Sequence, residues 1–186
     1  MELFPALKID WLNGWLVIVL LGLTDAVLFL AFPRPVVRRL WDRSGWSQKQ
    51  QSFTIAGKSC ALACLVLLTF TPLKIGQLVF EVGVILTALG WIGLVKAIYD
   101  FKRTPLDEPV TRGLYRISRH PQVVMSSLVI LAGCVKVGSW VAMIFWAAAR
   151  LMEHFGILAE EEICLKQYGE AYQAYMQRIP RYFLYF

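Results

Sequence analysis

Hydrophobic residues dominate this chain in long runs that short polar segments separate. Three runs cover residues 11–32, 53–73 and 77–98, and two more follow at 121–135 and 139–158. A helix needs about 20 consecutive apolar residues to cross the hydrocarbon core of a bilayer. The pattern therefore predicts an all-α, polytopic membrane protein with about five transmembrane or membrane-embedded helices.

The last two apolar runs are predicted to form a helical hairpin, because only a short turn separates them. The first of the two is short for a full crossing, so tilting or partial embedding is expected. We interpret residues 1–186 as a single membrane domain. Its first part, 1–98, holds three spans and a basic interfacial linker, 33–52, and its second part, 99–186, holds a polar loop, the hairpin and a C-terminal helix.

Charge and composition agree with a membrane protein and add an orientation. Charged residues make up 17% of the chain and the mean hydropathy is +0.55, whereas soluble domains carry about 25% charged residues. Segments 33–52, 96–120 and 150–186 hold five, six and four Lys or Arg residues, and the loops expected on the other side hold three. The positive-inside rule then predicts an N-terminus outside and a C-terminus in the cytoplasm of a bacterial inner membrane or endoplasmic reticulum. The net charge of +6 needs no nucleic-acid partner.

Small residues inside the spans are interpreted as packing positions. The four cysteines show no CxxC spacing, so neither a disulfide framework nor a metal site is expected. Gly83, Gly90 and Gly93 are typical of close contacts between helices. No Walker loop, GxGxxG motif, Ser-His-Asp set or HExxH motif occurs.

A cationic polar stretch, GLYRISRHPQ at 113–122, interrupts the apolar second half. Pro121 lacks an N–H and suits the first turn of the helix that follows, with His120 at the entry to that helix. The stretch is interpreted as a charged bend whose helix N-terminus can face an anionic ligand. The alternative is an arginine-rich loop that serves membrane topology alone.

Carboxylates and a second histidine follow the hairpin. Residues 160–162 are three adjacent glutamates, of which at most two can face one pocket because helical neighbours point about 100° apart. His120 and His154 are the only histidines, and a pair of histidines on adjacent helices raises the possibility of axial haem ligation. Arg178 and Arg181 are expected to anchor the aromatic tail at lipid headgroups.

GLYRISRHPQ, the apolar hairpin and EEEICLKQYGEAYQAYMQRIPR together resemble the integral-membrane methyltransferases of the isoprenylcysteine carboxyl methyltransferase and phospholipid methyltransferase families. The resemblance covers about residues 107–186. It implies S-adenosylmethionine bound between the polar loop and the C-terminal helix, with S-adenosylhomocysteine as product, and a lipophilic substrate that arrives through the bilayer.

The resemblance also implies residue roles. The implied cofactor contacts are Pro109, Val110, Tyr115, Arg119, His120, Pro121, Gln122, Val123 and Glu160. Methyl transfer to a carboxylate or thiolate needs positioning and water exclusion more than acid–base help. A lipid headgroup amine must first lose a proton, and His120, His154 or Glu161 would be the candidate catalytic base. Gly156 stands where the isoprenylcysteine enzymes carry a substrate-handling Arg, so the acceptor stays open.

Two other functions are compatible with the pattern. RHPQVV and YGEAY also resemble zeta-carotene-isomerase-like proteins, which makes a haem-binding membrane protein the first alternative. A non-catalytic membrane scaffold, with a loop that serves topology only, is the second. The sequence does not predict an oligomeric state.

Overall fold

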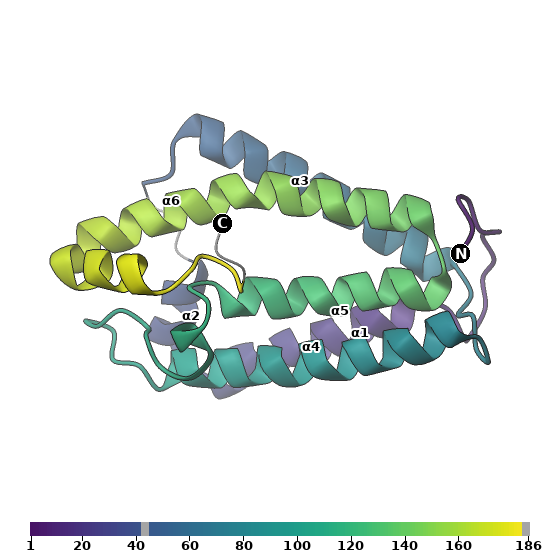
Figure 1. Ribbon diagram of the computed structural model, residues 1–186, viewed down its shortest axis with the longest axis horizontal. Helices are drawn as coiled ribbons and strands as arrows, with labels where there is room; N and C mark the ends of the chain where they lie inside the picture. Colours follow the sequence, from purple (N-terminus) through teal and green to yellow (C-terminus); the bar gives the residue numbers. More distant parts are fainter. Residues whose placement is uncertain (42–44, 184–186) are drawn as a thin grey trace.

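The computed structural model describes residues 1–41 and 45–183, and this part of the chain is helical and free of β-strands (Figure 1). The elements in chain order are α1 (Trp15–Ala31), α2 (Arg34–Trp41), α3 (Gln48–Phe70), α4 (Leu78–Lys102), the 3₁₀ helix η1 (Gly113–Arg116), α5 (Pro121–Val137) and α6 (Trp140–Arg178). The predicted all-α fold is confirmed.

Five of these helices are apolar enough to lie in a membrane. α3, α4 and α6 are long and hydrophobic enough to span it, and α1 and α5 are shorter apolar helices. α5 has 17 residues, which at about 1.5 Å per residue falls short of a hydrocarbon core about 30 Å thick. The predicted set of about five apolar helices and the short fourth one are therefore confirmed, whereas the first helix, predicted over 11–32, begins at Trp15 and is as short as α5, with 17 residues.

The apolar helices lie lengthwise beside one another, with α4 packed along α5 and α3 packed along α6 (Figure 1). The α4–α5 contact is close because α4 presents glycines to α5. A Cβ atom on Gly90 would lie 2.9 Å from Val129 Cγ2 and 3.1 Å from the Met125 carbonyl oxygen, so no larger residue fits without displacing α5. The close-packing interpretation of the glycines holds at this position.

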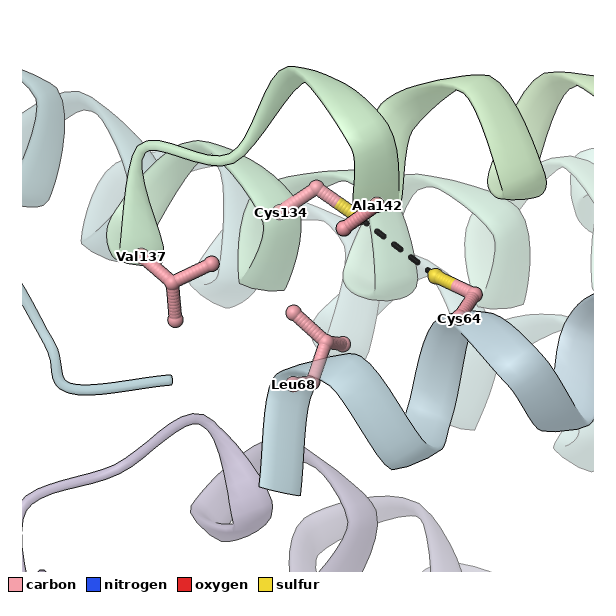
Figure 2. Close-up of a cluster of buried hydrophobic side chains, with 5 residues drawn as sticks. All are labelled: Cys64, Leu68, Cys134, Val137 and Ala142. Carbon is pink, nitrogen blue, oxygen red and sulfur yellow. Dashed lines mark hydrogen bonds between the residues drawn. The ribbon is translucent and has the colours of Figure 1, made fainter. Parts of the chain in front are cut away.

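A small buried cluster joins three helices near the end of the bundle opposite the polar loop. Figure 2 shows Cys64 and Leu68 of α3 against Cys134 and Val137 of α5 and Ala142 of α6. The two cysteine Sγ atoms are 3.6 Å apart, and both are free thiols. The cysteines are packing residues, as their spacing predicts.

The N-terminal residues cover the same end of the bundle. The Glu2 N–H donates to the Gly138 carbonyl at 2.8 Å, and the Lys8 N–H donates to the Phe70 carbonyl at 2.7 Å. Gly138 ends α5 with a left-handed φ of 66°, which suits glycine and turns the chain into α6. The other end of the bundle, which we call the site end, carries α2, the loop 103–120 and the last part of α6 (Figure 1).

α6 covers 39 residues and consists of two helices that meet at a kink, the first of which continues from the predicted fifth span into the predicted C-terminal helix without a break. Its apolar part ends near Leu158, and Glu160 begins a polar continuation. At Gly169 the backbone leaves helical geometry, with φ 53° and ψ −129°. The chain folds back there, so that the tail 179–183 returns to the start of α5 (Figure 1). This reversal was not predicted.

Candidate functional site

A cavity of about 540 Å³ lies at the site end, between α2, the polar loop and α6. Eight of the nine residues that the resemblance assigns to the cofactor line it: Pro109, Val110, Tyr115, Arg119, His120, Gln122, Val123 and Glu160. The ninth, Pro121, is fully buried at the first position of α5 and does not line the cavity. The tertiary structure thus gathers these predicted residues around one space.

The end of α4 shapes the polar loop. Asp100 is buried there, pairs with Lys96, and accepts a hydrogen bond from the Leu114 N–H at 3.2 Å. Gly113 takes a left-handed φ of 57° against this carboxylate, a conformation that favours glycine. The resulting 3₁₀ turn directs Tyr115 into the cavity wall.

Tyr115 is held from the other side by α6. The Tyr175 hydroxyl donates to the Tyr115 carbonyl oxygen at 2.7 Å. Burial raises the pKa of the Tyr115 phenol well above its ordinary value, so this ring stays neutral at physiological pH. The cavity wall on this side is therefore aromatic and uncharged.

A buried carboxylate, Glu161, connects three segments of the site. Both of its oxygens lie 3.1 Å from Arg181 Nε, and Arg181 Nη2 donates to Oε2 at 2.8 Å. His120 Nε2 is 3.2 Å from Oε1, and Arg119 Nε is at ion-pair distance, also 3.2 Å, without hydrogen-bond geometry. The side chain of Glu161 is only 4% exposed.

These contacts keep Glu161 ionised. Burial alone would raise the pKa of this carboxyl, but hydrogen bonds from His120 and Arg181 and the positive charge of Arg119 outweigh burial and lower the pKa to about 2. The hydrogen bond between Arg181 and Glu161 also raises the pKa of the Arg181 guanidinium. A carboxylate this acidic is a weak proton acceptor at neutral pH, and its geometry suits orienting His120 instead.

The C-terminal tail closes this arrangement. The Arg119 N–H donates to the Pro180 carbonyl at 3.0 Å, and the Ser118 hydroxyl donates to the Arg181 carbonyl, also at 3.0 Å. Arg181, expected from sequence at lipid headgroups, is thus drawn back onto Glu161 by the reversal at Gly169. Sequence reasoning missed this partner because nothing local signals that the tail folds back.

The two histidines have different surroundings. His120 directs Nδ1 to within 3.8 Å of a Glu160 carboxylate oxygen, in addition to its contact with Glu161. His154 does not line the cavity, and its Nδ1 is 2.8 Å from the Tyr182 hydroxyl. Of the three candidate bases, the structure brings His120 and Glu161 together and leaves His154 with the tail.

A second, smaller cavity of about 180 Å³ lies between α3 and α6, and Val123 and Glu160 line both cavities. Gly156 lines the smaller one, where an added Cβ would lie 3.1 Å from Thr54 Oγ1 and 3.2 Å from Trp46 Cη2. α3 and the linker before it therefore occupy the space that a longer side chain at position 156 would need.

The cavity also has a wall that sequence reasoning missed. Arg34, Arg38 and Arg39 of α2 line it, although the linker 33–52 was interpreted only as an interfacial segment. The i, i+4 spacing of Arg34 and Arg38 places them on one face of a helix, but nothing in the sequence indicates that this face meets a cavity built from α5 and α6.

Comparison with known proteins gives one result. The family model described as phospholipid methyltransferase matches residues 73–171, which is more than half of the chain. The matched stretch includes α4, the polar loop, α5 and most of α6, and it leaves out α2 and the tail. Searches of curated proteins and of solved structures found no significant match.

Proposed function

This chain belongs to the phospholipid methyltransferase family, and from that premise we propose that it transfers a methyl group from S-adenosylmethionine to a lipophilic acceptor in the bilayer. The observation that carries the proposal is the gathering of eight cofactor residues implied by the resemblance around one cavity. The acceptor group is a carboxylate, a thiol or a lipid headgroup amine.

The size of the cavity and several of its lining side chains suit S-adenosylmethionine. Its volume of about 540 Å³ lies within the range of about 300–1,000 Å³ usual for small-molecule sites. The rings of Tyr115, Tyr172 and Tyr175 line it and can pack against an adenine. Glu160 offers a carboxylate that can accept hydrogen bonds from ribose hydroxyls or an ammonium group. Arg119 can meet a carboxylate.

The protein's own contribution to the reaction is positioning and, for some acceptors, proton removal. When bound, S-adenosylmethionine supplies an electrophilic methyl group on a sulfonium. A carboxylate or thiolate acceptor needs only orientation in a water-poor cavity. For an amine acceptor, we assign His120 as the base, because it lines the cavity and the Glu161 carboxylate at 3.2 Å stabilises the imidazolium that forms. Glu161 then acts as a positioning residue.

The proposed orientation places the site end in the cytoplasm, the source of a water-soluble cofactor. Three segments rich in Lys and Arg support it, because α2, the polar loop and the end of α6 all lie at this end of the bundle (Figure 1). The positive-inside rule favours the cytoplasm for such an end. The N-terminus would then lie outside and the C-terminus in the cytoplasm.

Titration of the detergent-purified protein with S-adenosylhomocysteine, followed by calorimetry, tests the proposal. We expect saturable micromolar binding and an absorbance spectrum without a Soret band. His120→Ala and Glu160→Ala should each weaken binding about tenfold, since each removes a polar group that lines the cavity.

Glu162→Gln is the matched control, because Glu162 is exposed, lines neither cavity and accepts a 3.4 Å hydrogen bond from Gln50. It should bind S-adenosylhomocysteine as the wild type does. A wild-type protein that fails to bind and shows a Soret band would contradict the proposal and favour the haem alternative.

A further inference from the structure

Two arginines of α2 line the cavity with side chains that are open to solvent. Arg34 and Arg38 are both exposed and lie one helical turn apart. Within the described part of the chain neither forms a hydrogen bond, an ion pair or a ring contact, yet both border the cavity. Two guanidinium groups on one cavity edge form a site of concentrated positive charge.

A third arginine holds α2 in this place. Arg39 donates to the carbonyl oxygens of Pro105 at 2.9 Å and Glu108 at 2.7 Å, and to the Tyr168 hydroxyl at 2.9 Å. Its guanidinium also lies 5.2 Å from the centre of the Phe101 ring. These contacts tie α2 to the polar loop and to α6. The neighbouring Arg38, and Arg34 one turn before it, are thereby positioned at the cavity.

The charge on this edge does not suit the proposed cofactor. S-adenosylmethionine carries a sulfonium, an ammonium and one carboxylate, and it is therefore a net cation that a pair of arginines repels. An anionic group suits the site, because the arginine fork matches phosphate oxygens in a bidentate manner. The second reactant, the acceptor, is the molecule that can carry that group.

The position of α2 indicates which anionic group can reach its arginines. α2 directly follows the apolar helix α1, is strongly amphipathic and basic, and packs Val37 against the Leu28 and Ile98 cluster. A short amphipathic basic helix of this kind lies at the membrane–water interface. Lipid phosphates occupy that level, so they can reach the arginines while the acyl chains stay in the bilayer.

We propose that Arg34 and Arg38 form a phosphate subsite that holds the headgroup of a phospholipid acceptor at the cavity. This inference rests on the proposed methyl transfer, and it assigns binding of the acceptor to a helix outside the matched family region. The subsite brings the headgroup next to the cavity and leaves the reacting group free to enter toward His120.

The test compares two short-chain lipids that differ in the phosphodiester. Dioctanoyl phosphatidylmethanol carries it without an amine, and dioctanoylglycerol lacks it. Binding is measured by calorimetry in a neutral detergent, with and without S-adenosylhomocysteine. We expect the wild type to prefer the phospholipid by at least about tenfold, and Arg34→Gln/Arg38→Gln to lose this preference with unchanged affinity for S-adenosylhomocysteine.

Arg116→Gln is the control for surface charge, because Arg116 is exposed in the same basic end and lines neither cavity. Arg116→Gln should keep the preference for the phospholipid. If it loses as much of this preference as the double variant, general attraction between the basic surface and the anionic lipid explains the binding, and the proposal is wrong. A double variant that keeps the preference also overturns it. If the double variant instead loses affinity for S-adenosylhomocysteine alone, the anion is the cofactor's carboxylate and the proposal is wrong.

The two proposals fail separately. A wild-type protein that does not bind S-adenosylhomocysteine contradicts the proposed function. The two lipids can still be compared in the absence of S-adenosylhomocysteine, and that comparison tests Arg34 and Arg38 by itself. A wild-type protein that binds S-adenosylhomocysteine but treats both lipids alike contradicts the phosphate subsite only.

Discussion

Glu161→Ala is expected to lower the affinity for S-adenosylhomocysteine at least about hundredfold and to destabilise the protein by about 3–5 kcal/mol. The substitution removes the common partner of Arg119, His120 and Arg181. Two arginines would then share a largely buried site without a counter-charge, and such a broken buried ion pair is strongly destabilising. His120 would also lose the contact that orients its ring.

Denaturant unfolding in detergent measures the stability change, and the S-adenosylhomocysteine titration measures the affinity. Glu161→Gln keeps the volume of the side chain and removes the charge, so it should fall between the alanine variant and the wild type in both measurements. Glu162→Gln, the exposed neighbour, should match the wild type. A Glu161→Ala protein with wild-type affinity would show that the carboxylate does not organise the site.

Gly113→Ala is expected to cost about 2–5 kcal/mol of stability and to abolish methyl transfer. Two effects combine at this glycine. Its φ of 57° strains any residue with a Cβ, and the Cβ would overlap the buried carboxylate of Asp100. Relief of that overlap breaks the hydrogen bond from the Leu114 N–H to Asp100 and shifts Tyr115, which lines the cavity.

Gly76→Ala separates the two effects. Gly76 also has a positive φ, 80°, but nothing lies within 4 Å of the position of its Cβ. The control should therefore lose only the strain contribution, about 1–3 kcal/mol, and keep its affinity for S-adenosylhomocysteine. Denaturant unfolding and ligand titration of both variants make the comparison. If Gly113→Ala and Gly76→Ala lose the same stability and the same affinity, the overlap with Asp100 contributes nothing to either effect.

The membrane helices were predictable because their signal is local. A run of about 20 apolar residues meets the requirement of the bilayer wherever the rest of the chain lies. The close contact at Gly90 and the packing role of Cys64 and Cys134 follow from the same reasoning, since small residues in apolar helices allow neighbouring helices to approach. The cationic bend before Pro121 was equally visible, because proline marks the start of a helix.

The candidate site was predictable only in part. Nine cofactor residues were identified through a resemblance of motifs, and eight of them line one cavity. The resemblance gave Glu160 a cofactor contact, and Glu161 was a candidate base. Nothing in the sequence indicates that Glu161 is buried against two arginines and a histidine while Glu160 is half exposed. Burial depends on what packs against α6, and adjacent residues on a helix differ in that respect.

The sequence by itself determined the helical class, the membrane setting and the chemistry available near the polar loop, because each depends on composition or on motifs within a short stretch. Only the tertiary structure decided which charges meet. The chain reverses at Gly169, which brings Arg181 into contact with Glu161. Hydrogen bonds from Arg39 hold α2 in place, so that Arg34 and Arg38 border the cavity. These contacts join residues 20 to 129 positions apart, and long-range pairing follows from how helices pack together, which no local pattern encodes.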